Sequence, residues 1–208
     1  MSNSTSEMKS AEPSKRRAGP KRSEASKAAV LEAAYAELSE HGWRGFSVDR
    51  VAKEARASKQ TIYRWWRTPA RLAVDAALEK MPKSAQAEGD ARIRIEAIVA
   101  PLVRATRTGD GAHAWRSALL AAADDAEAGE AFRAWFNDTV KRPLRHVLAE
   151  QANKGRIRRD WDVDLAVEML AGPIWHRLIA MRSLVPERYA ERLADGLMDM
   201  LETGAPRG

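Results

Sequence analysis

Apolar residues recur at steps of three and four along most of this chain, and this spacing constrains the fold more than any other feature. Val30, Leu31, Ala34, Tyr35 and Leu38 are an example near the N-terminal end. Residues three and four apart lie on one face of an α-helix. The period-two alternation typical of strands does not persist for more than a few residues. The sequence therefore predicts an all-α fold.

Proline, glycine and capping residues divide this pattern into about nine helices. Gly42 fits the left-handed residue at which helices often stop. Ser47 and Ser58 are suited to cap a second and a third helix, and Thr68-Pro69 to start a fourth. The expected spans are 23–42, a short helix after Ser47, 59–66, 69–80, 90–107, 112–125, 127–154, 162–184 and 186–203, with breaks at Gly109-Asp110-Gly111, Gly129, Gly155 and Pro186.

Composition excludes several classes of protein. With 45% hydrophobic and 31% charged residues in 208, the chain has the balance of a folded domain. It contains no cysteine, which excludes disulfides, thiolate metal sites and a cysteine nucleophile. Its longest run without a charged residue, Met169 to His176, is too short to cross a bilayer, and no apolar segment follows the N-terminal basic residues. We expect a cytoplasmic protein without membrane contact.

The net charge of +6 is distributed unevenly. Residues 1–80 hold 16 Lys and Arg against 10 Asp and Glu, whereas residues 81–208 hold 19 of each. This asymmetry predicts a head that binds a polyanion, attached to a neutral body. The alternative is a basic tail without function. Residues 1–22 are expected to form a disordered arm, whose basic cluster is Lys15, Arg16, Arg17, Lys21 and Arg22.

Two short helices joined by three or four residues describe a helix-turn-helix motif. The first residues of its second helix would meet base edges in the major groove: Lys59 can donate to guanine, Gln60 can pair with adenine, and the methyl group of Thr61 can meet thymine. Residues 41–71 carry eight basic and two acidic residues. The candidates for contacts to the DNA backbone are Tyr63, Arg64, Trp65 and Arg67.

Two stretches carry a family resemblance. GWRGFSVDRVAKEA, residues 42–55, and SKQTIYRWW, residues 58–66, resemble the DNA-binding head of tetracycline-repressor (TetR/AcrR-type) regulators. The likeness covers about residues 24–80. It implies phosphate contact by Ser47, base reading by Lys59, Gln60 and Thr61, and contact of Tyr63 and Trp65 with the DNA backbone.

Three residues depart from the family pattern. Arg56 stands in the turn where the family often has a glycine of positive φ, which predicts strain of about 1 kcal/mol or an altered turn. Trp66 replaces a phenylalanine and is expected to be core. Pro69 replaces the usual phosphate-binding lysine, and Arg67 or Arg71 is the candidate substitute.

Two features of the head have alternatives. Tyr63 could be an ordinary core residue instead of a DNA contact. The basic residues of the arm could merely keep the protein soluble, or they could enter a minor groove or bind phosphates.

The resemblance implies that the C-terminal helices form a ligand chamber and a dimer interface. We expect a helix-turn-helix domain over residues 23–68, a connecting helix over 69–81 and a ligand-binding and dimerisation domain over 82–208. An ordinary core explains most of the apolar residues of this domain. The candidates for the chamber are Leu102, Trp115, Leu119, Phe136, Val140, Trp175 and His176.

The segment Leu170–Leu178 resembles a TetR-type subgroup that has Leu-Gly-Pro-Ile/Leu-Tyr-Tyr-Arg-Leu in its eighth helix. Gly172-Pro173 predicts a kink, because proline removes a backbone hydrogen bond. This helix and the last one are expected to pair with their copies across a two-fold axis. The expected apolar stripe of the last helix is Leu193, Leu197, Met200 and Leu201.

These observations predict a DNA-binding repressor that binds a near-palindromic operator as a homodimer and is released by a small apolar or amphipathic effector. No enzyme is expected, because the four histidines never stand at metal-ligand spacing and no glycine-rich phosphate loop occurs. No metal or cofactor is expected either. Two alternatives stay open: a helical small-molecule-binding protein or enzyme with an incidental basic head, and a nucleoid binder without sequence preference.

Overall fold

The computed structural model describes residues 20–84 and 87–202. Within these ranges the chain is helical and forms no β-sheet, so the predicted all-α fold is confirmed. The elements are α1 (Pro20–Gly45), α2 (Val48–Glu54), α3 (Lys59–Trp65), α4 (Pro69–Glu79), α5 (Ala91–Ala105), α6 (Gly109–Asp124), α7 (Ala126–Phe136), the π-helical turn η1 (Asn137–Lys141), α8 (Arg142–Asn153), α9 (Val163–Trp175), the π-helical turn η2 (His176–Ala180) and α10 (Tyr189–Leu201).

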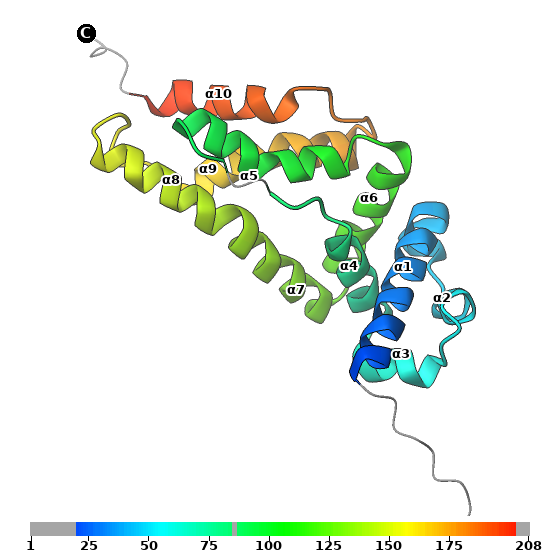
Figure 1. Ribbon diagram of the computed structural model, residues 1–208. Coiled ribbons are helices and arrows are strands. Elements are labelled where there is room, and N and C mark those ends of the chain that lie inside the picture. Colours follow the sequence, from blue (N-terminus) through cyan, green and yellow to red (C-terminus); the bar gives the residue numbers. More distant parts are fainter. Residues whose placement is uncertain (1–19, 85–86, 203–208) are drawn as a thin grey trace, which may run out of the picture.

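Helices α1, α2 and α3 form a small head at one end of the molecule (Figure 1). Its core joins Val30 and Ala34 of α1 to Val51 of α2 and Ile62 of α3. Trp66, at the end of α3, is 2% exposed, as expected for a core residue. Ile62 and Trp66 thus anchor α3 in this core.

Helix α4 connects the head to the rest of the molecule. It packs against α1 on one side and against α6 and α7 on the other. Its buried face is built from small residues, with Ala70, Ala73 and Val74 lying against Leu38 of α1 and Ala121 of α6. Small side chains let helices approach closely. Helix α4 is therefore in close contact with the head and with the body at once.

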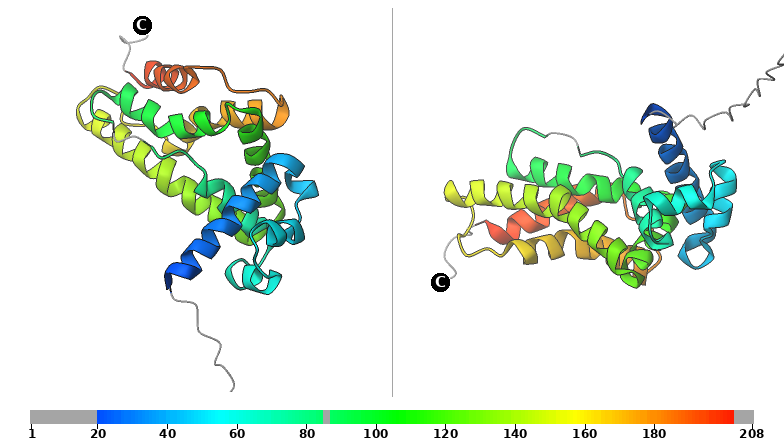
Figure 2. Two further views of the ribbon diagram at one scale, coloured as in Figure 1. Left: turned by 45° about the vertical axis from the view of Figure 1, so that its right-hand side comes forward. Right: turned by 90° about the horizontal axis from the view of Figure 1, so that it is seen from below.

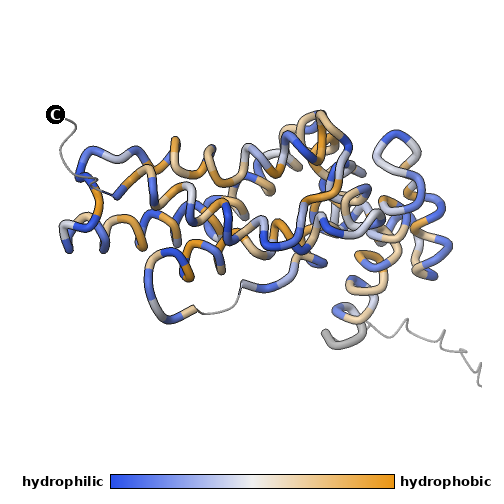
Figure 3. Tube along the Cα trace, turned by 90° about the horizontal axis from the view of Figure 1, so that it is seen from above, coloured by the Kyte–Doolittle hydropathy of each residue, from blue (hydrophilic) through white to orange (hydrophobic). Residues whose placement is uncertain are grey.

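The body stacks α5, α8, α9 and α10 around one large core, as Figure 2 shows. Hydrophobic and hydrophilic positions are interleaved along these helices in the tube view of Figure 3, as expected for amphipathic helices that each bury one face. Helix α7, η1 and α8 continue from one into the next, in agreement with the single helix predicted over 127–154. The π turn ends at Lys141, two residues before Pro143. Proline has no N–H to donate and its ring clashes with the carbonyl of the preceding turn, so a regular helix is disrupted here.

Gly172-Pro173 has a comparable effect in α9. The helix passes into the π turn η2 three residues after Pro173, so the irregularity predicted there takes this form. The expected helix over 162–184 ends earlier, at Ala180, and Arg182 has a positive φ of 48°.

Two other predicted details are wrong. The break placed at Gly109–Gly111 lies inside α6, because Thr108 caps this helix by accepting from the N–H of Gly111 at 3.1 Å. The apolar stripe assigned to the dimer interface on α10 is divided: Leu197 and Leu201 are buried in the protomer's own core, whereas Met200 is exposed. Helix α10 packs its apolar face on α5, and the spacing of that stripe could not show which neighbour covers it.

Candidate nucleic-acid interface

Ser58 fixes the start of α3. Its hydroxyl oxygen accepts from the N–H of Thr61 at 3.1 Å and lies 2.9 Å from the hydroxyl of Thr61, as predicted for an N-cap. Lys59 and Gln60 follow and are exposed, and Thr61 is half-buried. The first turn of α3 therefore presents the three predicted base-reading residues at the surface of the head.

The opposite face of α3 holds the helix in place. Ile62 is buried, and the indole N–H of Trp66 donates to Asp75 of α4 at 2.9 Å. Tyr63, on the outer face, is 46% exposed, so it is not a core residue. The guanidinium of Arg64 lies 5.7 Å from the ring centroid of Trp65, which is half-buried. Helix α3 therefore has one face in the core and one free face carrying polar and cationic groups.

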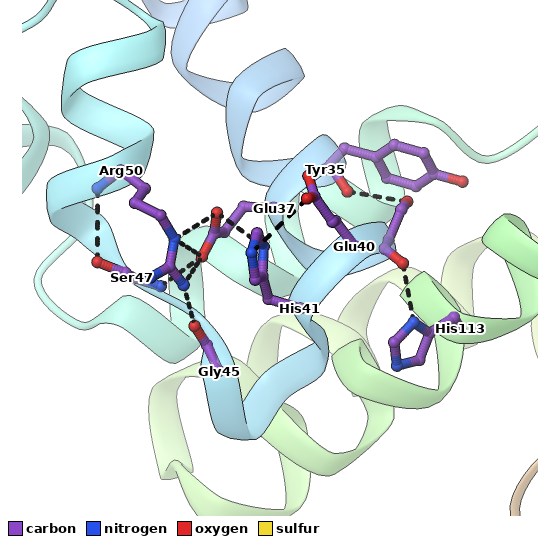
Figure 4. Close-up of polar contacts among 9 residues, drawn as sticks. Tyr35, Glu37, Glu40, His41, Gly45, Ser47, Arg50 and His113 are labelled. Atoms are coloured by element: carbon purple, nitrogen blue, oxygen red, sulfur yellow. Dashed lines mark hydrogen bonds and ion pairs between the residues drawn. The ribbon is translucent and has the colours of Figure 1, made fainter.

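Ser47 starts α2 and is held by a carboxylate of α1 (Figure 4). Its hydroxyl accepts from the N–H of Arg50 at 3.4 Å, and its own N–H donates to Glu37 at 3.0 Å. Glu37, whose side chain is 6% exposed, also accepts from Arg50 Nε at 2.9 Å, and this bond raises the pKa of the Arg50 guanidinium. Arg50 in turn donates to the carbonyl of Gly45. This set of contacts ties the start of α2 to α1.

Sequence analysis missed Glu37. The signal available was an acidic residue directly before Leu38, on a helix face that is otherwise apolar. A buried carboxylate needs charged or N–H partners. The sequence could indicate that Glu37 needs a partner, but Arg50 lies thirteen residues away on another helix.

A second ion pair missed by sequence analysis joins α2 to α3. Lys59 Nζ lies 2.7 Å from Asp49 Oδ1, and both side chains are exposed. The hydrogen bond to Asp49 raises the pKa of the Lys59 ammonium. One predicted base-reading residue is therefore already paired with a carboxylate of the same head.

The turn between α2 and α3 has the feature predicted for it. Arg56 has a φ of +50°, the left-handed conformation that the family often gives to glycine at this place. The N–H groups of Arg56 and Ala57 donate to carbonyls of α2, at Lys53 and Ala52. The turn therefore keeps the left-handed geometry with arginine in the place of glycine.

Arg67 and Arg71 are the two proposed substitutes for the missing phosphate-binding lysine. Arg71 forms ion pairs with two carboxylates of the protein. Its Nε donates to Asp75 at 2.9 Å, and Nη1 lies 3.7 Å from Glu127 of α7. Arg67 is exposed beside the end of α3. Arg71 is therefore held by two carboxylates, whereas Arg67 is at the surface; the phosphate contact of either stays a prediction.

Two polar contacts join the head to the body. His113 Nδ1 of α6 lies 2.8 Å from the carbonyl oxygen of Ser39 in α1, and Figure 4 shows the His113 ring directed at α1. The indole N–H of Trp43 donates to Asp124, at the end of α6, at 2.8 Å. Helix α6 therefore contacts the last turns of α1 directly.

The body contains a chamber of about 570 Å³ between the end of α4, α5 and the α7–η1–α8 rod. Two of the predicted chamber residues, Leu102 and Val140, line it, and their contact with a ligand stays a prediction. Its other lining residues are Leu78, Glu79, Met81, Pro82, Lys83, Ser84, Ile98, Pro101, Trp135, Thr139 and Pro143.

The other five predicted chamber residues do not line it. Trp115 is 1% exposed and packs 5.9 Å from the ring of Trp135. Phe136 and Trp175 lie in the same aromatic cluster, with ring centroids 6.4 Å apart. Leu119 packs beside this cluster, and His176 is exposed. The ordinary-core interpretation describes Trp115, and a ligand role for these five residues stays a prediction.

Large apolar side chains are exposed around α9 and α10. They lie on α9, on η2, in the segment that follows it and on α10: Leu165, Ile179, Met181, Leu184 and Met200. Nowhere in the described ranges, residues 20–84 and 87–202, is a group of three or more His, Asp or Glu residues placed to hold a metal ion. In the same ranges, no helix is long and apolar enough to cross a membrane.

Two family models match the chain. Residues 30–73 match the model for bacterial regulatory proteins of the tetR family, and residues 85–197, more than half of the chain, match the model for a tetracyclin repressor-like C-terminal domain. The chain belongs to the tetracycline-repressor (TetR) family. It is a DNA-binding transcriptional regulator of this family, as the resemblance predicted, whereas the predicted C-terminal subgroup stays a prediction.

Individual TetR-type relatives agree. The chain is 28% identical over 181 residues to an uncharacterized HTH-type transcriptional regulator of Bacillus subtilis, YdeS, covering 84% of this chain and 89% of that one. It is 45% identical over 58 residues to the HTH-type transcriptional repressor SCO4008 of Streptomyces coelicolor, covering 28% and 30%. All of these named relatives are regulators and none is an enzyme.

Solved structures show the same fold. The TetR family regulator SCO0332 is 26% identical, with a TM-score of 0.61 over 84% of this chain and 97% of that one. FadR of Bacillus subtilis, in complex with stearoyl-CoA, is 17% identical, with a TM-score of 0.61 over 86% and 98%. The second likeness concerns the fold alone.

Proposed function

We propose that this TetR-family regulator is a repressor that binds a near-palindromic operator as a homodimer and leaves it when a small molecule enters the body. The observation that carries the proposal is the free face of α3. Lys59, Gln60 and Tyr63 point outward there, while Ile62 and Trp66 fix the helix from within. The relative SCO4008, which is similar to this chain over 58 residues, is named a repressor. The protein acts in the cytoplasm, at the nucleoid.

In this proposal the head, residues 23–68, has two kinds of DNA contact. Lys59, Gln60 and Thr61 read base edges, because the first turn of a helix in the major groove reaches them. The contacts that position the head on the DNA backbone come from side chains at the two ends of the motif: Ser47, Tyr63, Arg64, Trp65 and Arg67.

Dimerisation supplies the second head. The apolar side chains exposed on α9, on η2 and on α10 are the candidates for this interface, because the family resemblance assigns dimerisation to the last helices. Two identical heads related by a two-fold axis read two half-sites of a palindrome. Within α10 the contact to the partner involves Met200 and not Leu197 or Leu201, which face the protomer's own core.

The effector acts through α4. The chamber is lined by Leu78 of α4 and by Met81 just after it, and by Leu102 and Val140 of the body. A molecule in the chamber therefore touches the helix that carries the head. It can shift the protein between two arrangements of the heads only if its affinity for them differs.

The proposal is tested by gel-shift titration of the full chain with DNA from its own upstream region. We expect a single shifted species that contains a protein dimer. Lys59→Ala and Tyr63→Ala should each lower the affinity about tenfold or more, because each removes a base or backbone contact worth about 1–3 kcal/mol. Arg145→Ala is the matched control, since Arg145 is exposed on α8 in the body. If the two head variants bind as tightly as this control, α3 is not the recognition surface.

A further inference from the structure

A second cavity, of about 410 Å³, adjoins the chamber. The two cavities share two lining residues, Ile98 of α5 and Pro143 of α8. We call this second cavity the vestibule. Its full lining is Ala87, Arg94, Ala97, Ile98, Arg142, Pro143, His146 and Val147.

The chamber has an apolar wall. Met81, Leu102, Trp135 and Val140 line it, and the hydroxyl of Thr139 already donates to the carbonyl of Trp135 at 2.7 Å. Among the described residues, every buried side-chain nitrogen or oxygen already has a hydrogen-bond partner within the protein. The chamber wall therefore offers a ligand no unpaired buried polar atom. The groups of the chamber that are charged, Glu79 and Lys83, are both exposed and opposite in sign. The chamber therefore favours an apolar part of a ligand.

The vestibule has the opposite character. Arg94, Arg142 and His146 line it, and no carboxylate does. Arg94 Nη1 lies 2.6 Å from Glu150, and Arg142 Nη2 lies 2.6 Å from Asp138. An arginine has five N–H donors, so each guanidinium keeps donors for a further anion.

The nearby acids do not balance this charge. Glu150 is shared between Arg94 and Lys154, and the two bonds lower its pKa from 4.5 to about 2, with the bond from Lys154 contributing most. Three cations, Arg94, Arg142 and Lys154, thus stand against two carboxylates, before His146 is considered. The vestibule is a cationic region directly beside an apolar one.

We propose that the chamber and the vestibule together bind an amphipathic anion, with its apolar chain in the chamber and its carboxylate or phosphate group at Arg94, Arg142 and His146. This inference rests on the proposed function in that it names the chemical class of the effector. The chamber volume lies within the range of about 300–1,000 Å³ usual for small-molecule sites. Planar guanidinium groups recognise both carboxylates and phosphates through paired N–H donors.

The test uses four probes with one ten-carbon chain and different head groups: decanoate, decyl phosphate, decanol and decyltrimethylammonium. Each is titrated calorimetrically into the full-length protein below its micelle-forming concentration. We expect at least one of the two anions to bind about tenfold more tightly than decanol, since charge-assisted hydrogen bonds are about twice as strong as neutral ones. The cation should not bind measurably. The stronger anion tells a carboxylate from a phosphate source.

Variants locate the head group. Arg94→Gln and Arg142→Gln should each bring the anion to within about threefold of decanol, while decanol binding stays unchanged. Arg145→Gln is the matched control, because it removes one positive charge from α8, the helix that carries Arg142, and Arg145 lines neither cavity. If Arg94→Gln lowers the stability of the fold, Arg142→Gln alone tests where the head group binds, because Arg142 is exposed and its replacement should leave the fold intact. Leu102→Trp, which fills the chamber, should weaken binding of decanol and of both anions alike.

Equal affinity for decanol and both anions overturns the proposal, and so does an equal loss in the Arg145 control. Failure of the proposed function looks different. If an anion binds with this selectivity but does not release DNA, the ligand class stands and the effector role fails. If the protein without any probe does not bind DNA, the repressor proposal fails while the ligand measurements keep their meaning.

Discussion

Lys59 and Asp49 form an ion pair of 2.7 Å across the tips of α2 and α3, on the face of the head proposed to meet DNA. Both side chains are exposed, so the pair contributes little to stability. If α3 meets DNA as proposed, the pair affects binding: Asp49 offsets the charge of the Lys59 ammonium, and its carboxylate repels phosphates. The pair would then penalise DNA sequences that give Lys59 no better partner.

Asp49→Asn removes this penalty. We expect tighter binding to unrelated DNA, a smaller ratio of operator affinity to unrelated affinity, and a salt dependence steeper by about one unit of log–log slope, because one further cation becomes free to displace a counterion. Measuring binding to both DNAs over a series of salt concentrations checks this. Glu54→Gln, an exposed acid at the other end of α2, is the control. An unchanged ratio and slope for Asp49→Asn would contradict this role of the pair.

Glu37→Gln should loosen the head. The amide keeps the shape of the side chain but loses the charge that holds Arg50 and the N–H of Ser47. We expect a loss of about 1–2 kcal/mol in the free energy of unfolding, measured by denaturant titration, and weaker operator binding. Glu40→Gln, an exposed carboxylate on the same helix, should change neither quantity. Equal stability of the two variants would show that Glu37 is not needed to hold α2.

Gly42→Ala should destabilise the protein for two reasons that can be separated. Gly42 has a φ of +67°, and a Cβ there would lie 2.9 Å from Nε2 of His113. Gly155 has nearly the same φ, +69°, with open space around it. Gly155→Ala should therefore cost about 1–2 kcal/mol from the backbone alone, and Gly42→Ala more.

Adding His113→Ala to the Gly42 variant isolates the steric part. The alanine opens the space that the new Cβ needs, so the cost of Gly42→Ala measured in this background should fall toward that of Gly155→Ala. Denaturant titrations of the four variants supply the comparison. Costs that are equal at the two glycines from the outset would mean that the contact between α6 and α1 is not tight.

Leu165→Glu should convert the dimer into a monomer. Leu165 is 53% exposed on α9 at the proposed interface, and a carboxylate there would be buried unpaired on association. Sedimentation velocity measures the change, and operator affinity should fall with it, because one head alone reads one half-site. Ile93→Glu is the control, since Ile93 is similarly exposed on α5. A dimer that survives Leu165→Glu places the interface elsewhere.

Stability should fall as the pH drops through the acid range, partly through Glu150. Its pKa is near 2 in the folded state against 4.5 ordinarily, so its contribution is complete above about pH 4.5 and is lost as the pH falls toward 2. Glu150→Gln should lower Tm at pH 6 and leave it close to the original at pH 2. A Tm difference that is the same at both pH values would argue against the Arg94–Glu150–Lys154 contacts.

Local patterns predicted the elements of the head well. The caps at Ser47, Ser58 and Thr68 depend on residues three positions away, so the sequence alone contains the whole interaction. The left-handed turn at Arg56 was predictable from the family motif, which often has a glycine of positive φ at that position.

Contacts between helices were harder to predict from the sequence. Glu37 and Arg50, or Lys59 and Asp49, are ten or more residues apart, and many other pairings would satisfy the same charges. In the body, the predicted chamber residues were chosen for size, but large aromatic side chains such as Trp115 pack on each other and fill space instead of lining it. Leu102 of α5 and Val140 of η1 do line the chamber.

Selection of bound DNA from a randomised pool would show whether the free face of α3 reads DNA sequence. We expect the full-length dimer to enrich a two-fold symmetric sequence, and Gln60→Ala to shift the preferred base at the same position in both half-sites. Enrichment of no sequence, with binding that depends on salt alone, would contradict this expectation and leave a binder of DNA without sequence preference.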